Sequence, residues 1–201
     1  MKPLLLVFCK NALLGQVKTR LAATIGEAKA LALYKELLAK TARVVAATGY
    51  PFAVWHTPSP QADPLWQALT PHCYPQPSGD LGARMQAAFT WAFDQGYTHV
   101  VGIGSDLWTL EASDLQQAVQ ALQTHEVVLG PAQDGGYYLI GKKQLIPALF
   151  QNKKWSTAEV LPQTLADLHD KAYYCLSPKN DIDTQEDLQK HPDLWKKLLL
   201  E

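Results

Sequence analysis

Short apolar runs alternate with stretches of helical periodicity along the chain. Five of these runs predict strands, at residues 4–9, 52–56, 127–129, 137–141 and 172–176. A sixth run begins at His99 and stops at Gly104, Ser105 and Asp106, so it predicts a buried strand with an acid at its C-terminal end. Ligands of parallel α/β sheets bind beyond such strand ends, which makes Asp106 the first candidate functional residue.

Apolar residues at helical spacing predict helices between the strands. They lie at residues 27–48, 65–69, 81–95, 115–122, 185–190 and 194–200, and helical sequence also follows Lys18. A capping-box pattern, Ser156-x-x-Glu159, predicts a helix that begins at Thr157 and bends at Pro162. Six prolines in residues 57–80 predict a long, mostly irregular loop. The alternation favours an α/β fold, with a mainly parallel sheet in a three-layer α/β/α domain spanning residues 1–201.

Composition and charge narrow the function classes. The chain is 47% hydrophobic, which is enough for a sizeable core at 201 residues. Its formal net charge is −1 and it has no basic run, so a nucleic-acid partner is disfavoured. Cys9, Cys73 and Cys175 have no disulfide or zinc spacing and indicate reduced thiols in a cytoplasm. The first apolar run is too short for a secretory signal, and no run approaches the ~18 apolar residues of a membrane span.

A second acidic cluster, Asp181-Ile182-Asp183, follows the last predicted strand. If it shares the sheet edge with Asp106, two carboxylates can hold a divalent cation, which Mg²⁺ completes with water and phosphate oxygens. Both acids also have a structural interpretation, because an aspartate after a strand often caps a helix and two capping patterns overlap at residues 183–187. Capping explains one acid of the cluster but does not require both. We therefore predict Asp106 and Asp183 as metal ligands.

The first loop contributes cations. Gly15, Lys18 and Arg20 lie where a predicted helix begins, and helix amides together with basic side chains bind anions. A solvated basic turn is the structural alternative. The loop has neither the Gly-x-x-x-x-Gly-Lys-Ser/Thr of nucleoside triphosphatases nor the Gly-x-Gly-x-x-Gly of dinucleotide folds, so both classes are disfavoured. We predict Gly15, Lys18 and Arg20 as nucleotide-binding residues.

Two further motifs have both a structural and a functional interpretation. Asp134-Gly135-Gly136 is typical of a tight turn, but two glycines also allow a ligand to approach the backbone closely. We predict Gly135 and Gly136 as nucleotide-binding and Asp134 as a catalytic base. Asp80 is predicted either to bind the nucleotide or only to cap the helix that follows it.

Six segments together resemble a known bacterial family, the radical-SAM/selenodomain-associated transferases of type one. They are residues 15–21, 79–85, 103–106, 130–139, 155–157 and 181–184, and the Gly-Pro-Ala-x-Asp-Gly-Gly-Tyr-Tyr run at 130–138 is the most specific. The family is glycosyltransferase-like and has been linked to arsenosugar biosynthesis. The resemblance implies the GT-A fold of nucleotide-diphospho-sugar transferases, which molybdenum-cofactor guanylyltransferase and 2-phospholactate guanylyltransferase also use. It also implies that Asp106 and Asp183 hold a divalent cation, Mg²⁺ or Mn²⁺, and that the Lys18 and Arg20 loop contacts nucleotide phosphates.

Two positions depart from the family pattern. Leu107-Trp108 stands where the family usually has Cys-Pro, and Gln133 stands where it usually has Glu. The first departure reshapes the wall beside the metal, and the second removes a candidate base.

We expect a metal-dependent transferase that passes a sugar from a nucleoside-diphosphate sugar to a small acceptor, with Asp106 at the catalytic centre. One alternative is nucleotidyl transfer with release of pyrophosphate. The other is a nucleotide-binding protein without catalysis, which Leu107-Trp108 and Gln133 would favour. The sequence specifies neither the nucleotide, sugar and acceptor nor the oligomeric state.

Overall fold

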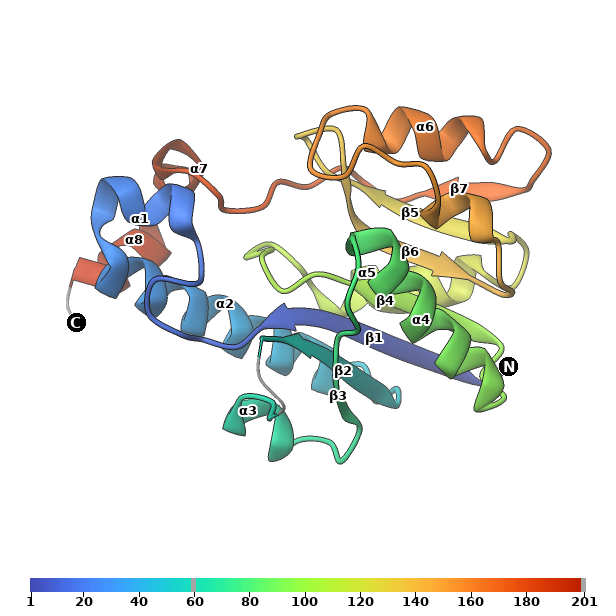
Figure 1. Cartoon of the computed structure of the whole chain (residues 1–201), viewed down its shortest axis with the longest axis horizontal. Coiled ribbons are helices and arrows are strands. Elements are labelled where there is room, and N and C mark those ends of the chain that lie inside the picture. The colour runs from blue at the N-terminus through green and yellow to red at the C-terminus, as the bar shows by residue number, and fades with distance from the viewer. Residues whose placement is uncertain (59–60, 200–201) are drawn as a thin grey trace.

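A computed structural model describes residues 1–58 and 61–199 of the chain. In this part of the chain the strands form one sheet in the order β3-β2-β1-β4-β6-β5-β7 (Figure 1). The strands are β1 (Pro3–Lys10), β2 (Phe52–Thr57), β3 (Cys73–Pro75), β4 (His99–Ile103), β5 (Val127–Pro131), β6 (Tyr137–Lys142) and β7 (Tyr173–Cys175). Each predicted strand is present. The mainly parallel α/β sheet is thereby confirmed.

One strand interrupts the parallel order. β1 pairs in parallel with β2 and β4, β2 with β3, and β5 with β7, whereas β6 is antiparallel to both β4 and β5. The short connection between β5 and β6 permits only a hairpin, since a parallel crossover needs a dozen or more residues. β6 therefore lies between β4 and β5.

Helices cover the sheet. They are α1 (Thr19–Ile25), α2 (Glu27–Ala47), α3 (Pro64–Gln67), α4 (Leu81–Asp94), α5 (Ala112–Ala121), the 3-10 helix η1 (Pro147–Phe150), α6 (Val160–Ala166), α7 (Gln185–Gln189) and α8 (Pro192–Leu199). None of these helices combines the length and the hydropathy of a membrane span. Leu200, at which the last predicted helix ends, lies outside the described residues.

One sequence prediction is incomplete and another is wrong. The proline-rich segment contains β3, a short edge strand whose Cys73 and Tyr74 pair with β2. The predicted capping box at Ser156 does not form, because Ser156 has a left-handed backbone (φ 62°) and α6 begins only at Val160. Pro162 then falls in the first turn of α6, where a missing amide hydrogen is tolerated.

Alternating side chains of the central strands enter two different cores. Leu5 and Val7 of β1 pack with α2 and α5 on one face, and Leu4 and Leu6 pack with α4, η1 and α6 on the other. Both faces are thus buried, as parallel sheets require. The result is the predicted three-layer arrangement.

A third apolar cluster lies at one end of the molecule. It joins Leu21 of α1 and Leu33 of α2 to Ile182, Leu188 and residues of α8. In Figure 1 the C-terminal helices α7 and α8 accordingly lie beside α1, away from the strand that precedes them. This packing returns the segment around Ile182 to the C-terminal end of β4.

Candidate functional site

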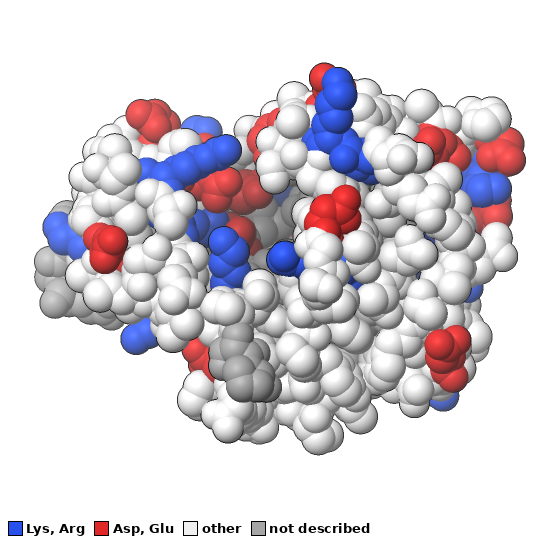
Figure 2. All heavy atoms as spheres, viewed as in Figure 1, with Lys and Arg blue, Asp and Glu red and all other residues white. Residues whose placement is uncertain are grey.

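A pocket opens at the C-terminal ends of β1, β2 and β4. Its volume is about 470 Å³, which is within the usual range for small-molecule sites. Its charged lining residues are Lys10, Lys18, Arg20, Arg84, Asp106 and Asp183. Figure 2 shows a recess on this face with basic and acidic side chains around it. In the strand order, β1 and β4 flank the point at which the topology reverses, where ligands of open α/β sheets bind.

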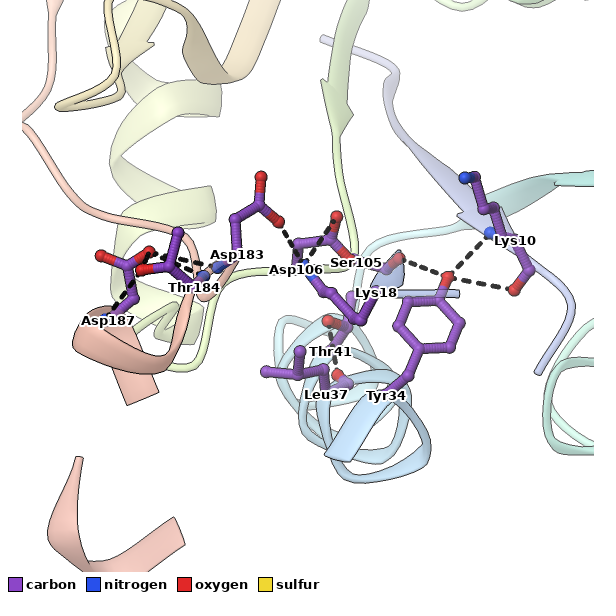
Figure 3. A network of polar contacts seen from close by, with 10 residues as sticks. All are labelled: Lys10, Lys18, Tyr34, Leu37, Thr41, Ser105, Asp106, Asp183, Thr184 and Asp187. Atoms are coloured by element: carbon purple, nitrogen blue, oxygen red, sulfur yellow. Dashed lines mark hydrogen bonds and ion pairs between the residues drawn. The ribbon is translucent and has the colours of Figure 1, made fainter. Parts of the chain in front are cut away.

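Three charged side chains converge inside the pocket. Lys18 Nζ lies 3.3 Å from Asp106 Oδ2 and 2.8 Å from Asp183 Oδ1 (Figure 3). The side chain of Lys18 is 4% exposed, whereas those of the two acids are nearly half exposed. Burial by itself lowers the pKa of Lys18, but the charges of Asp106 and Asp183 outweigh burial and the net pKa is raised. The two predicted acids therefore do share one site, and an ammonium group bridges them.

Asp106 has no capping role. α5 begins at Ala112, and the backbone N–H of Glu111 before it donates to Asp114 instead. The backbone oxygen of Asp106 accepts a hydrogen bond from the backbone N–H of Ile182 at 3.3 Å, which ties the two acidic segments together. Asp106 Oδ1 is buried without a hydrogen-bond partner among the described residues. A buried carboxylate oxygen of this kind is expected to bind a ligand, an ion or water.

Asp183 is also free of a capping role. Thr184 is the N-cap of α7 and forms a capping box with Asp187, whose Oδ2 accepts from the backbone N–H of Thr184 at 3.0 Å and of Asp183 at 3.3 Å. Two overlapping capping patterns in the sequence left open whether Asp183 or Thr184 caps this helix, and in the structure Thr184 does. The Asp183 carboxylate therefore remains available to the pocket.

The other two acids lie at different places. Asp181 borders a second, smaller cavity of about 90 Å³ that Asp106 also borders. Burial, together with the charges of Asp134, Asp183 and Asp106, raises the pKa of Asp181 to about 6. Asp134 lines neither cavity; its Oδ1 accepts from the backbone N–H of Gly136 at 2.9 Å and closes the turn. The structure thus gives Asp134 a role in the turn, outside the lining of the two cavities.

The cations of the first loop reach the pocket through side chains. Lys18 and Arg20 both line it, as does Arg84 from the first turns of α4. α1 is only seven residues long, and so its backbone dipole is small. Lys18 and Arg20 are therefore placed as predicted with respect to the pocket, but Lys18 is paired with carboxylates.

Asp80 and Gly135 have local structural roles. Asp80 caps α4, accepting from the backbone N–H of Ala83 at 2.8 Å. Gly135 has a φ of 88°, and a Cβ there would lie 2.5 Å from the backbone of Ala158, so its close approach is to the chain itself. Gly15, Gly136 and Asp80 are absent from the lining of both cavities.

Two pocket residues, Tyr34 and Gln76, had no signal in the sequence. The Tyr34 hydroxyl accepts from Lys10 N at 2.8 Å, donates to Lys10 O at 3.0 Å and lies 3.2 Å from Ser105 Oγ. Gln76 Nε2 donates to Cys9 O and to the backbone oxygen of Trp55, which fixes the amide across the ends of β1 and β2. Tyr34 fits the helical period of α2 and Gln76 stands in the proline-rich segment, so only their spatial neighbours reveal them.

The two departures from the family pattern are accommodated in the fold. Leu107 is buried in the core with α2 and α5, and Trp108 packs against the C-terminal helices and donates to Asp193 Oδ2 at 3.3 Å. The backbone N–H of Gln133 donates to Lys179 O, and its side chain is exposed. None of these three residues lines the 470 Å³ pocket.

The site can provide part of a metal coordination shell. In the described residues, no cluster of three or more His, Cys, Asp or Glu side chains is placed to hold a metal ion. Asp106 and Asp183 provide two carboxylates that already share one cation, the Lys18 ammonium. Mg²⁺ is commonly held by one or two carboxylates plus phosphate oxygens and water, so this donor set fits a metal that binds with a phosphorylated ligand.

The model of the bacterial family DUF2064, described as uncharacterized protein conserved in bacteria, matches residues 39–157. The chain belongs to this family. The matched segment contains Asp106 but neither Lys18 nor Asp183. No curated protein matches the chain.

Solved structures with the same fold include transferases that act on nucleotides. A candidate nucleotide-diphospho-sugar transferase from Desulfovibrio desulfuricans G20 is 29% identical, with a TM-score of 0.85 over 98% of each chain. CMP:2-keto-3-deoxy-manno-octonic acid synthetase, complexed with CTP, is 9% identical, with a TM-score of 0.61 over 98% of this chain and 99% of that chain. Rv0371c from Mycobacterium tuberculosis H37Rv, complexed with manganese, is 13% identical, with a TM-score of 0.58 over 94% and 97%. The fold is that of nucleotide-diphospho-sugar transferases, and it supports a transferase of the nucleotide-sugar or nucleotidyl kind.

Proposed function

We propose that the protein is a metal-dependent transferase that passes a sugar from a nucleoside-diphosphate sugar to a small acceptor. The proposal is carried by the convergence of Asp106 and Asp183 on the ammonium group of Lys18, which shows that the two carboxylates can share a positive charge. They lie beside Arg20 and Arg84 in the 470 Å³ pocket at the strand ends. The likeness to the Desulfovibrio structure and the glycosyltransferase-like resemblance of the sequence motifs support sugar transfer over other chemistries of the fold.

The residues of the pocket have distinct roles in this proposal. Asp106 and Asp183 bind the divalent cation, which when bound stabilises negative charge on the departing diphosphate as a Lewis acid. Arg20 and Arg84 contact phosphate oxygens, for which the planar guanidinium is suited. Tyr34 and Ser105 connect the end of β1 to the segment that carries Asp106 and keep the two sides of the pocket in register.

A thermal-shift panel tests the proposal. Nucleoside diphosphates, triphosphates and diphospho-sugars are added with and without Mn²⁺ to the full chain and to Asp106→Asn, Asp183→Asn and Asp94→Asn. A ligand at 100 times its dissociation constant adds ~2.7 kcal/mol to the free energy of unfolding. We expect a diphospho-sugar with Mn²⁺ to stabilise the parent and Asp94→Asn but neither pocket variant, because Asp94 is exposed at the end of α4.

The alternatives give different results. Unchanged Mn²⁺ and diphosphate binding in Asp106→Asn contradicts the proposed site. Stabilisation by triphosphates alone, with release of pyrophosphate from a triphosphate and a phosphorylated acceptor, identifies a nucleotidyltransferase. Binding of the diphospho-sugar with no product across a broad acceptor panel, followed by mass spectrometry, identifies a protein that binds nucleotides without catalysis.

A further inference from the structure

Lys18 already binds the two carboxylates that the proposed function assigns to the divalent cation. Figure 3 shows its ammonium group between Asp106 and Asp183, which come from widely separated parts of the sequence. The distances from Nζ are 3.3 Å and 2.8 Å, and only 4% of the Lys18 side chain is exposed. This ammonium neutralises part of the negative charge that a bound metal ion would otherwise neutralise.

The backbone is built to hold Lys18 in this position. Lys18 has a left-handed conformation, with φ 47° and ψ 44°, which residues other than glycine seldom adopt. On one side Val17 is buried in the core, and on the other Thr19 begins α1. Because both neighbours are fixed, Lys18 is not a mobile surface lysine that meets the acids by chance.

A divalent cation bound at Asp106 Oδ2 and Asp183 Oδ1 would need the same two oxygen atoms as Lys18. Mg²⁺ binds oxygen at about 2.0–2.1 Å, whereas an ammonium group binds the same oxygens by hydrogen bonds near 3 Å. Two positive charges this close repel each other strongly. Metal binding at Asp106 Oδ2 and Asp183 Oδ1 therefore requires the ammonium to leave them.

A displaced ammonium needs another anion, because a buried charge without a partner is strongly unfavourable. The other charged side chains that line the pocket are Lys10, Arg20 and Arg84, all of which repel it. A diphosphate in the pocket offers oxygen acceptors to Lys18 and to the incoming metal together.

We infer that Lys18 makes binding of the divalent cation conditional on binding of a diphosphate. Its ammonium holds Asp106 and Asp183 until phosphate oxygens replace them as its partners. The inference rests on the proposed function, which places both ligands in this pocket. By linkage, the metal raises the affinity for the diphosphate by the same factor.

Calorimetric titration of Mn²⁺ into the full chain tests the competition directly. We expect Lys18→Met to bind Mn²⁺ about tenfold more tightly than the parent when no diphosphate is present, a coupling within the range usual for linked sites. Lys10→Met is the matched control, since it removes the same charge from the same pocket without an ion pair to either acid. It should change the Mn²⁺ affinity far less than Lys18→Met does.

A second titration uses inorganic pyrophosphate as the diphosphate probe, corrected for the manganese complex that it forms in solution. Pyrophosphate should raise the Mn²⁺ affinity of the parent about tenfold, and that of Lys18→Met by a much smaller factor. Circular dichroism checks the fold of the variant, and Lys18→Gln is measured in the same way if Lys18→Met does not fold. The pyrophosphate effect on the parent requires no variant at all.

The outcomes separate this inference from the proposed function. Equal or weaker Mn²⁺ binding by Lys18→Met overturns the competition, as does a parent whose Mn²⁺ affinity pyrophosphate leaves unchanged. If Asp106→Asn still abolishes Mn²⁺ binding in that case, the proposed metal site stands. If the parent and both Lys18 variants bind no Mn²⁺ even with pyrophosphate, the competition and the proposed metal site both fail.

Discussion

Lys18 and Lys142 are both buried next to the same sheet, but in opposite electrostatic surroundings. Lys18 lies at the C-terminal end of β4 between two carboxylates. Lys142 ends β6, opposite Val100 in the first half of β4, and is 0% exposed. Its Nζ has no hydrogen-bond partner among the described residues and lies 4.5 Å and 4.0 Å from the ring centres of Phe89 and Phe150.

The difference shows how the same ammonium group can be held in two ways. Carboxylates compensate the burial of Lys18, and its pKa is raised. Burial lowers the pKa of Lys142 to about 7, because aromatic rings replace only part of the lost hydration. Lys18 therefore has partners that a ligand can exchange, whereas Lys142 belongs to an apolar core and lines neither of the two cavities described above.

The largest expected change in stability is that of a variant at Lys142. Lys142→Met keeps the length and the apolar contacts of the side chain and removes the buried amine, so it should raise the free energy of unfolding by about 3 kcal/mol at pH 7. The ~2 kcal/mol by which the two aromatic rings stabilise the buried ammonium has been subtracted in this value. Urea unfolding measures it, with Lys143→Met as the control at a partly exposed neighbour.

The pH dependence of that effect has a definite sign. The pKa of Lys142 is about 7 in the folded chain against an ordinary 10.5, so between these values only the unfolded chain gains the proton. Stability of the parent therefore falls as pH falls towards 7 and does not fall further below it on this account. The difference between Lys142→Met and the parent should shrink from pH 7 to pH 9. A difference independent of pH would show that Lys142 is charged throughout.

Lys18→Met should lower the free energy of unfolding, whereas Lys142→Met should raise it. Removing one partner of a buried ion pair costs about 3–5 kcal/mol, but here both carboxylates are nearly half exposed and remain hydrated. We expect the free energy of unfolding to fall by about 1–2 kcal/mol in urea. Lys10→Met should leave it nearly unchanged, and a stabilised Lys18→Met would mean that both lysines are merely tolerated.

The smallest expected change in stability is that of a variant at Asp187, whose carboxylate accepts a hydrogen bond from the backbone N–H of Asp183. Asp187→Asn weakens hydrogen bonds to Asn180, Thr184 and Lys190, which lower the pKa of Asp187 to about 2 despite its partial burial. Its carboxylate stabilises the fold above an ordinary pKa of 3.8, and this stabilisation is lost as pH falls towards 2. We expect a loss of about 1 kcal/mol at pH 7 that diminishes by pH 3.

The exposed neighbour Glu186 provides the control for this variant. Glu186→Gln removes a carboxylate from the same turn of α7 and should leave both the stability and its pH dependence unchanged. Equal loss in the two variants would assign the effect to the helix dipole instead of the hydrogen bonds of Asp187.

Local patterns were enough to locate Asp106 and Asp183. Apolar runs placed Asp106 just after a strand, and overlapping capping patterns placed Asp183 just before a helix, because burial and helix capping depend on residues a few positions away. The capping pattern at Ser156 failed, since Ser156 has a left-handed backbone and α6 begins only at Val160. The sequence predicts Asp134 as a catalytic base, and the structure adds that one of its carboxylate oxygens closes the turn.

By itself, the amino-acid sequence determined the three-layer arrangement, the acids beyond the strands and, apart from β3 and η1, most of the strands and helices in their order. Only the tertiary structure decided that β6 lies between β4 and β5, and that α7 and α8 return to α1. That return brings Asp183 to within 2.8 Å of Lys18, across 165 residues of sequence. The pairing depends on apolar contacts among Leu21, Ile182 and Leu188, which no short sequence pattern contains. Electrostatic partners are chosen by position in space, and so the different surroundings of Lys18 and Lys142 appear only in the folded chain.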